Sequence, residues 1–187
     1  MSQQKLKITE LRQIIAEKEG RVLRGFLPSS TLASGIPKGA ISEIAGTARI
    51  EWVAQFLSEN PRLNVFWAEK VFSLFPTAFY QRGISLNRFI FAECGDELFA
   101  SVRKALRSQV FQCVVSPLKF PDEKFLKALQ LLTERSNCSL LLLSERIEPR
   151  WPICLQVRVN QTAGESAFEI DIYKNKRGIA QDALVTM

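Results

Sequence analysis

Gly46 lies where the sequence comes closest to a phosphate-binding loop. It follows an apolar run at residues 40–45 and precedes a segment with helical spacing of apolar residues. A working loop has the pattern GxxxxGK[ST], in which the lysine contacts the terminal phosphates and the hydroxyl contacts magnesium. Counted from Gly46, the last three positions hold Glu51, Trp52 and Val53. None has the required chemistry, and the Glu51 carboxylate would repel phosphate, so we expect only a tight turn at Gly46.

The chain contains no histidine, and this excludes several classes of catalytic and metal site. Ser-His-Asp and Cys-His catalytic units, HExxH metalloproteases and Cys2His2 fingers all need that residue. Acid–base chemistry is left to Glu, Asp, Lys or Tyr. The four cysteines include no CxxC pair, and Cys113 and Cys138 lie within apolar runs. We therefore expect buried, reduced thiols and no metal site.

The length of 187 residues fits one domain with short appendages. With 47% hydrophobic residues and 13 phenylalanines, the chain can bury a real core. We expect a helix within residues 1–20, a core domain at 21–178 and a tail at 179–187. The amino terminus lacks the apolar segment of a signal peptide and no run is long enough to span a bilayer, so we expect a soluble cytoplasmic protein without membrane contact.

Short apolar runs alternate with segments of helical periodicity along the core. Strands are expected at residues 40–45, 64–68, 88–93, 111–115 and 139–143, and helices at residues 50–58, 74–82, 96–108 and 122–135. This alternation predicts a doubly wound, mainly parallel α/β sheet. Two period-2 runs, 154–160 and 168–173, predict a C-terminal antiparallel hairpin. Residues 21–38 are rich in Gly, Pro and Ser and are expected to form a loop.

Five segments in the same order resemble the core of the RecA family. They are GIPKGAISEIAG (residues 35–46) and residues 64–94, 104–116, 138–147 and 170–178. In that family the corresponding segments lead into the phosphate loop, form the second strand with its following helix and strand, reach the Walker B aspartate, and form the next and the final strands. The resemblance covers roughly residues 25–178 and implies a RecA-like fold.

The resemblance also assigns three further positions of the family's nucleotide site. Glu69 occupies the place of the glutamate that orients the attacking water, Ser116 falls near the Walker B aspartate, and Glu145 stands at the glutamine that senses the γ-phosphate. A short segment, residues 148–154, replaces the long DNA-binding loop. With the phosphate, metal and sensor positions lost, the resemblance implies no ATPase activity and no cofactor. We expect Glu69 to be solvated or ion-paired, and Arg49 gives only weak evidence of an anion contact.

This pattern of loss is most similar to the ImuA group, RecA-like accessory proteins of bacterial damage-induced mutagenesis. That group shares a degenerate phosphate loop and an ALRSG-like helix end, which here is residues 105–109. The similarity implies a non-catalytic adaptor of the DNA-damage response. Its expected partners are RecA and an error-prone polymerase assembly, with either an inactive Y-family polymerase or a replicative-type enzyme. The SulA group shares the helix-end motif, and its similarity implies the alternative of a cell-division inhibitor that binds FtsZ.

Two basic clusters contribute to the net charge of +6 and are candidate contacts for DNA or a partner. The first lies on the helix expected at residues 96–108 and the second follows the last strand. Their members are Arg103, Lys104 and Arg107, and Lys174, Lys176 and Arg177. Weak, salt-dependent DNA binding is one interpretation and an ordinary solvated surface is the other.

Aromatic residues suggest one further candidate contact. Trp151 lies in an expected loop, where it either packs over the hairpin or anchors a partner. RecA-type domains associate head to tail, so self-association or a different partner at that interface is also expected. Phe72, Phe75, Phe79 and Tyr80 have near-helical spacing and are expected to pack in the core rather than stack on bases.

Overall fold

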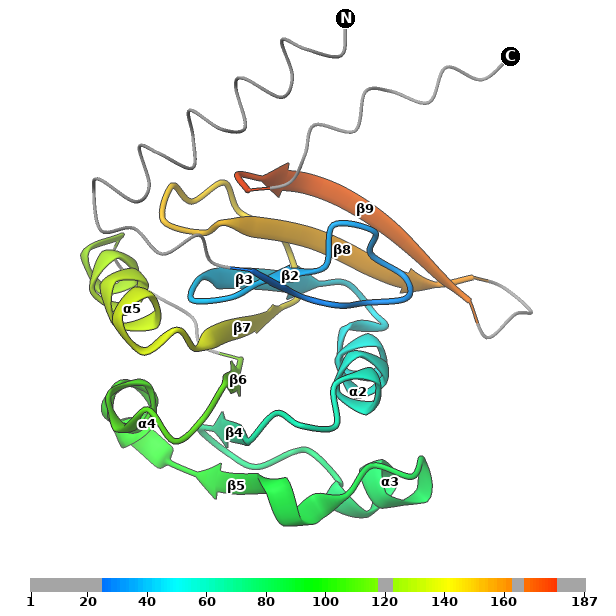
Figure 1. The fold of residues 1–187 in the computed structure, drawn as a ribbon, viewed down its shortest axis with the longest axis horizontal. Helices are drawn as coiled ribbons and strands as arrows, with labels where there is room; N and C mark the ends of the chain where they lie inside the picture. Colours follow the sequence, from blue (N-terminus) through cyan, green and yellow to red (C-terminus); the bar gives the residue numbers. More distant parts are fainter. Residues whose placement is uncertain (1–24, 118–122, 163–166, 178–187) are drawn as a thin grey trace, which may run out of the picture.

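The computed structural model describes residues 25–117, 123–162 and 167–177. The expected N-terminal helix, the C-terminal tail and most of the turn between the last two strands lie outside these residues. The described part contains a small two-stranded sheet and a seven-stranded sheet, and helices pack on both faces of the larger sheet (Figure 1).

The elements of the larger sheet begin and end within two residues of the positions expected from the sequence. The strands are β3 (Ile41–Ala45), β4 (Val65–Glu69), β5 (Phe89–Glu93), β6 (Cys113–Ser116), β7 (Ser139–Ser144), β8 (Leu155–Gln161) and β9 (Phe168–Asn175). The helices are α2 (Arg49–Glu59), α3 (Pro76–Gln81), α4 (Leu98–Ser108) and α5 (Glu123–Ser136). Single 3-10 turns, Leu86–Arg88 and Gly95–Glu97, precede β5 and α4.

The strand order is β5-β4-β6-β7-β3-β8-β9. Every neighbouring pair from β5 to β8 is parallel, and β9 alone runs antiparallel, beside β8. The predicted mainly parallel sheet with a C-terminal antiparallel hairpin is therefore confirmed. Strand β8 belongs to both parts, because it pairs in parallel with β3 and closes the hairpin with β9.

Alternating side chains of the central strands build two separate cores. Ile44 of β3 joins the core beneath α2 and α3, whereas Ile41 joins the core beneath α4 and α5. Neighbouring residues of a strand point to opposite faces. Strands covered on both faces need apolar residues at successive positions, which explains the continuous apolar runs in the sequence. Figure 1 shows the two helix pairs on opposite faces of the sheet.

Two expectations about the fold are wrong. Residues 21–38 do not form only a loop, since β1 (Phe26–Leu27) and β2 (Ile36–Pro37) pair antiparallel. Helix α3 begins at Pro76, one residue after Phe75, so the helical spacing assumed for the aromatic residues starts too early. Phe75 and Tyr80 are 75% and 71% exposed, whereas Phe79 is buried as expected and Phe72 packs partly buried against the core.

The four cysteines are free thiols, and three of them are buried. Burial raises the pKa of Cys113 to about 12 and also raises the pKa values of Cys138 and Cys154. Cys94 is half-buried. None of the helices in the described ranges has both the length and the apolar character needed to cross a bilayer.

These burials predict one accessible thiol in the folded protein. A disulfide reagent such as DTNB should react with Cys94 first, because only the thiolate attacks and the other three thiols are buried and held neutral. Denaturant should release all four. The fast phase should disappear in Cys94→Ser, and a fast phase that persists in this variant would contradict the assignment.

Candidate functional site

The turn at Gly46 joins β3 to α2 through only Gly46, Thr47 and Ala48. The φ angle of Gly46 is +100°, and a Cβ at this position would collide with the carbonyl oxygen of Val159 in β8. Glycine is required both for this backbone conformation and for the close approach of the neighbouring strand. The expected tight turn is confirmed, and the structure adds its cause.

Strand β8 lies directly against the turn and bonds to it. The Ala48 amide donates to the Val159 carbonyl at 3.2 Å, and the amide and hydroxyl of Thr47 each lie 3.4 Å from Oδ1 of Asn160. In a phosphate-binding loop, such backbone amides point at the anion. Here two of them are bonded to β8, so the turn is closed by the protein itself.

The residues at the failed motif positions have structural roles in α2. Trp52 and Val53 are buried in the core, and the Trp52 indole donates to Oγ1 of Thr31 at 2.7 Å. The Glu51 carboxylate pairs with Arg82 at 2.6 Å. These side chains stabilise the helix against its surroundings and leave no lysine or hydroxyl at the positions that act on nucleotide.

Arg49, the remaining candidate for an anion contact, is also held by the turn. Its Nη1 donates to the carbonyl oxygen of Gly46 at 2.9 Å. The guanidinium therefore fastens the start of α2 to the turn that precedes it.

Glu69 departs from expectation, because it is neither solvated nor ion-paired in the described structure. It is 4% exposed at the end of β4. One carboxylate oxygen accepts the Trp67 indole N–H at 2.8 Å, and the other accepts the backbone amide and the hydroxyl of Ser73 at 2.7 and 2.8 Å. Trp67 and Glu69 are two residues apart in a strand and share a face. The carboxylate thus links β4 to the segment before α3.

Ser116 and Glu145 complete the set of positions from the family's nucleotide site. Ser116 is fully buried at the end of β6, and its hydroxyl has no hydrogen-bond partner within the described structure. Glu145 follows β7 and is exposed. Within residues 25–117, 123–162 and 167–177, no group of three or more acidic or cysteine side chains is placed to hold a metal ion.

The second basic cluster, after β9, is used largely to fasten the chain. Lys174 donates to the carbonyl of Arg150 at 2.6 Å, Lys176 donates to the carbonyl of Trp151, and Arg177 donates to the carbonyl of Lys38 at 2.8 Å. Burial, and then the nearby charge of Lys176, lower the pKa of Lys174. The two lysines thus join the end of β9 to residues 148–154, and Arg177 joins it to the residue that follows β2.

The tertiary structure brings Trp151 together with this cluster. Trp151 is 59% exposed, and its ring lies 4.3 Å from the ammonium of Lys176 and 5.8 Å from that of Lys127 in α5. Both interpretations of Trp151 keep some support, since the ring contacts the end of the hairpin and still presents surface to solvent.

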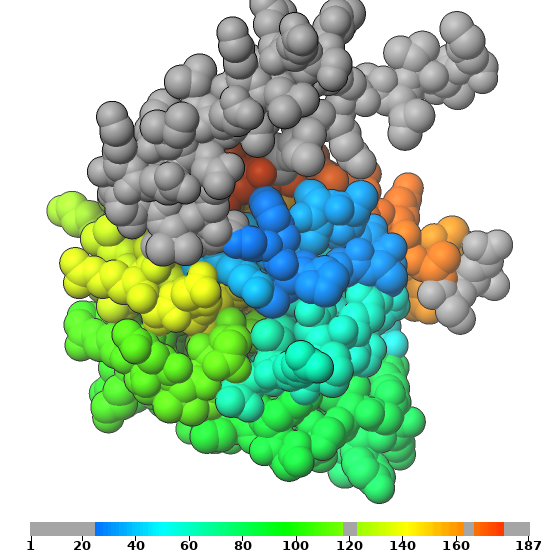
Figure 2. All heavy atoms as spheres, viewed as in Figure 1, coloured from blue at the N-terminus to red at the C-terminus, as the bar shows by residue number. Residues whose placement is uncertain are grey.

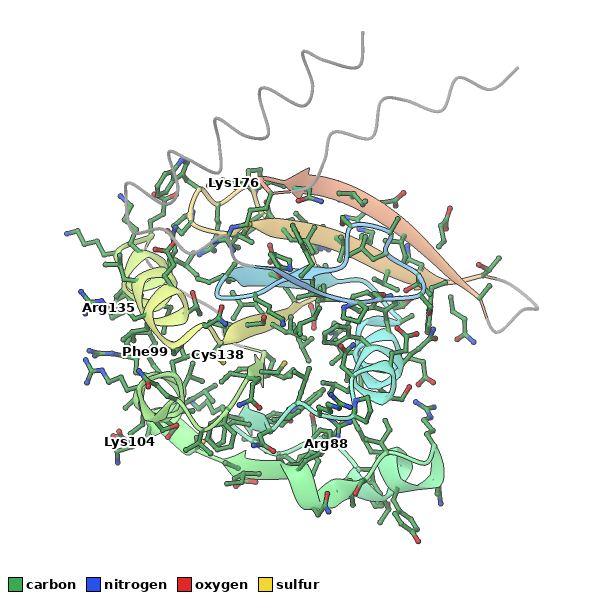
Figure 3. The ribbon with its side chains drawn as sticks, viewed as in Figure 1. Arg88, Phe99, Lys104, Arg135, Cys138 and Lys176 are labelled. Atoms are coloured by element: carbon green, nitrogen blue, oxygen red, sulfur yellow. The ribbon has the colours of Figure 1, made fainter. Side chains whose placement is uncertain are left out.

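The first basic cluster lies on α4, on the other side of the sheet from the Gly46 turn. Lys104 and Arg107 are exposed, and Lys104 points away from the sheet in Figure 3. The Arg103 guanidinium lies 5.6 Å from the Phe99 ring centroid. The two basic clusters therefore differ, because only the first presents most of its cations to solvent.

Three exposed apolar side chains near α3 were not anticipated from the sequence. Val71, Phe75 and Tyr80 are each more than 70% exposed, and we refer to them together as the apolar patch. Pro76 is the one sequence signal for it, because a proline at the first helical position places Phe75 outside the helix. Large apolar side chains grouped at a surface are typical of protein interaction sites.

The Gly46 contacts predict a large difference between two glycine substitutions. Gly46→Ala should destabilise the fold by at least about 2 kcal/mol, because strain at positive φ adds to a collision with β8. Gly83→Ala is the matched control: its φ is +75° but nothing lies within 4 Å of a Cβ there, so about 1 kcal/mol is expected. Urea denaturation of both variants measures this, and equal losses would contradict the close approach.

The Glu69 contacts predict a structural phenotype. Glu69→Ala should lower the free energy of unfolding by about 1–3 kcal/mol, because the Trp67 indole and the Ser73 amide lose their acceptor. Glu145→Ala, at an exposed carboxylate, should change it by less than about 0.5 kcal/mol. A Glu69→Ala protein as stable as the parent would show that these hydrogen bonds contribute nothing.

Comparison with known proteins supports the fold and no closer assignment. No protein-family model matches the sequence, and no curated protein matches it. Among solved structures, the crystal structure of the RadB recombinase is similar, with a TM-score of 0.62 and 13% sequence identity. The likeness covers 80% of this chain and 87% of that chain. At this identity the likeness shows the fold alone, and the chain has a RecA-like fold.

Proposed function

We propose that this chain is a non-catalytic RecA-like adaptor of the bacterial DNA-damage response, of the ImuA type, acting in translesion mutagenesis. The observation that supports the absence of catalysis is the Gly46 turn, whose amides are bonded to Val159 and Asn160 of β8. Glu51, Trp52 and Val53, at the last three positions of the loop motif, add support because none is the glycine, lysine or hydroxyl residue of a working loop. The partners follow from the sequence resemblance: RecA, or an error-prone polymerase assembly with an inactive Y-family or a replicative-type polymerase.

Two different surfaces support an adaptor rather than a single-partner protein. The apolar patch of Val71, Phe75 and Tyr80 lies on the α3 side of the sheet, and the exposed cations of α4 lie on the opposite side. Surfaces on opposite faces leave room for two partners at once. Self-association through a RecA-type interface and weak DNA binding remain predictions beside this proposal.

The helix-end motif does not separate the ImuA type from the SulA type. Gln109 follows α4 with φ of +58°, and the Ser108 hydroxyl donates to the carbonyl of Ala105 at 2.7 Å. Residues 105–109 thus form the end of a helix. A motif with this structural role can be shared by proteins of different function. FtsZ binding by a SulA-like inhibitor is therefore the alternative that the experiment must address.

The non-catalytic part of the proposal predicts that ATP and magnesium produce no saturable heat in calorimetric titration and no phosphate release. The physical reason is that the turn amides, Trp52 and Glu69 are all bonded or buried within the protein. RecA serves as the positive control. Micromolar binding with turnover would refute this part.

The adaptor part predicts direct binding to RecA on single-stranded DNA or to the polymerase, measured with purified proteins on an immobilised full-length chain. Phe75→Ser combined with Tyr80→Ser should weaken that binding about tenfold, because the variant lacks the two exposed rings that the partner would bury in the complex. Val110→Ser is the matched control, an exposed apolar residue beyond the end of α4. Binding to FtsZ with loss of its GTPase activity, and none to RecA or polymerase, would favour the SulA-like alternative.

A further inference from the structure

Basic side chains from three distant parts of the sequence lie on one continuous surface over α4 and α5. The rings of Phe99 and Phe125 join the two helices edge to face at 4.9 Å. Lys127 of α5 and Lys176 at the end of β9 both approach the Trp151 ring. Figure 3 shows Lys176, Arg135, Phe99 and Lys104 along the same side of the molecule, and Figure 2 shows α4 and α5 next to each other at that surface. We call this surface the basic strip, and its cations are Arg103, Lys104, Arg107, Lys127, Arg135 and Lys176.

The cations of the basic strip, unlike three cations elsewhere in the described structure, are not paired with a carboxylate. Elsewhere Lys70 pairs with Asp96, Arg82 with Glu51, and Arg150 with Glu148. Among the described residues, no ion pair joins a cation of the strip to a carboxylate. Glu134, the nearest acidic residue along the chain to Arg135, accepts a hydrogen bond from Gln130 at 3.1 Å. A surface that concentrates unpaired positive charge attracts an anionic partner.

Apolar side chains lie among these charges. They help to decide whether the anionic partner is a nucleic acid or an acidic polypeptide. Leu131 is 55% exposed and lies four residues from both Lys127 and Arg135, on the same outer face of α5. Phe125, at the contact between the helices, is 42% exposed. A nucleic-acid backbone offers nothing apolar to cover Leu131.

The aromatic rings of the basic strip are poorly placed to stack on nucleic-acid bases. The Trp151 ring is approached by the ammonium groups of Lys127 and Lys176, and Phe99 by Phe125 and the Arg103 guanidinium. Single-stranded nucleic acid is bound on aromatic faces that are open to the bases. The mixture of cations and exposed apolar groups instead fits a polypeptide that carries both carboxylates and apolar side chains.

We propose that the basic strip docks an acid-rich, amphipathic segment of a protein partner. The carboxylates of that segment pair with the cations of α4 and α5, and its apolar residues cover Leu131 and Phe125. This inference rests on the proposed function in one respect, namely that the partner is a protein. It uses a surface on the opposite side of the sheet from the apolar patch at α3.

The test measures fluorescence anisotropy of a labelled synthetic peptide, rich in Glu with Leu at every third or fourth position, titrated with the full chain. The comparison probes are polyglutamate of the same length and a DNA duplex. The amphipathic peptide should bind more tightly than either. Lys104→Glu combined with Arg107→Glu should weaken it about tenfold, since two exposed attractions become repulsions. Arg62→Glu, an exposed charge reversal between α2 and β4, is the matched control and should leave the affinity unchanged.

A second variant separates the apolar contribution from the charge. Leu131→Ser should weaken the amphipathic peptide about fivefold and leave polyglutamate binding unchanged. Absence of peptide binding, tighter binding of the duplex, or an unaffected Leu131→Ser variant would each overturn the proposal. Failure of the adaptor function is recognised separately, as absence of binding to RecA and polymerase in the assay with purified proteins, while the peptide result still stands.

Discussion

The close approach of β8 to the Gly46 turn is the contact on which the rest of this structure depends. Strand β8 lies parallel to β3, so the Val159 carbonyl and the Asn160 side chain reach the end of β3 and bond to the amides that follow it. Only glycine fits beneath that carbonyl. Helix α2 therefore begins at Arg49 without a longer loop, and its first turn directs Trp52 into the core. The backbone amides of Thr47 and Ala48 are therefore bonded within the protein.

Hydrogen bonds within the protein also hold the Glu69 carboxylate. A carboxylate at the end of a parallel strand is well placed to act on a ligand at the sheet's carboxyl edge. Here its two oxygens are bound by Trp67 and Ser73, which fixes the path of the chain as it leaves β4. That path leads directly to the exposed side chains of Val71 and Phe75. The hydrogen bonds of Glu69 thus help to position the chain segment that carries these exposed side chains.

Helices on both faces of the sheet give the molecule two unlike surfaces. The face with α2 and α3 has an apolar patch, whereas the face with α4 and α5 has exposed cations that no described ion pair joins to a carboxylate. The cations after β9 belong only partly to that second surface, because most of them donate to backbone carbonyls. The number of cations in the sequence therefore overstates how many can bind a partner. Cations that already donate hydrogen bonds to backbone carbonyls are less available than the exposed ones.

Sequence alone determined the order of elements, the parallel sheet and the terminal hairpin. These properties follow from local periodicity and from residue type, which act over a few neighbouring positions. Only the tertiary structure decided that β8 closes the Gly46 turn, that Glu69 is buried and bonded, and that Lys127, Trp151 and Lys176 meet. Asn160 is 113 residues from Thr47, and Lys176 is 25 from Trp151. Pairings at such separations are set by strand register and helix packing across the sheet, and periodicity along one segment contains no information about them.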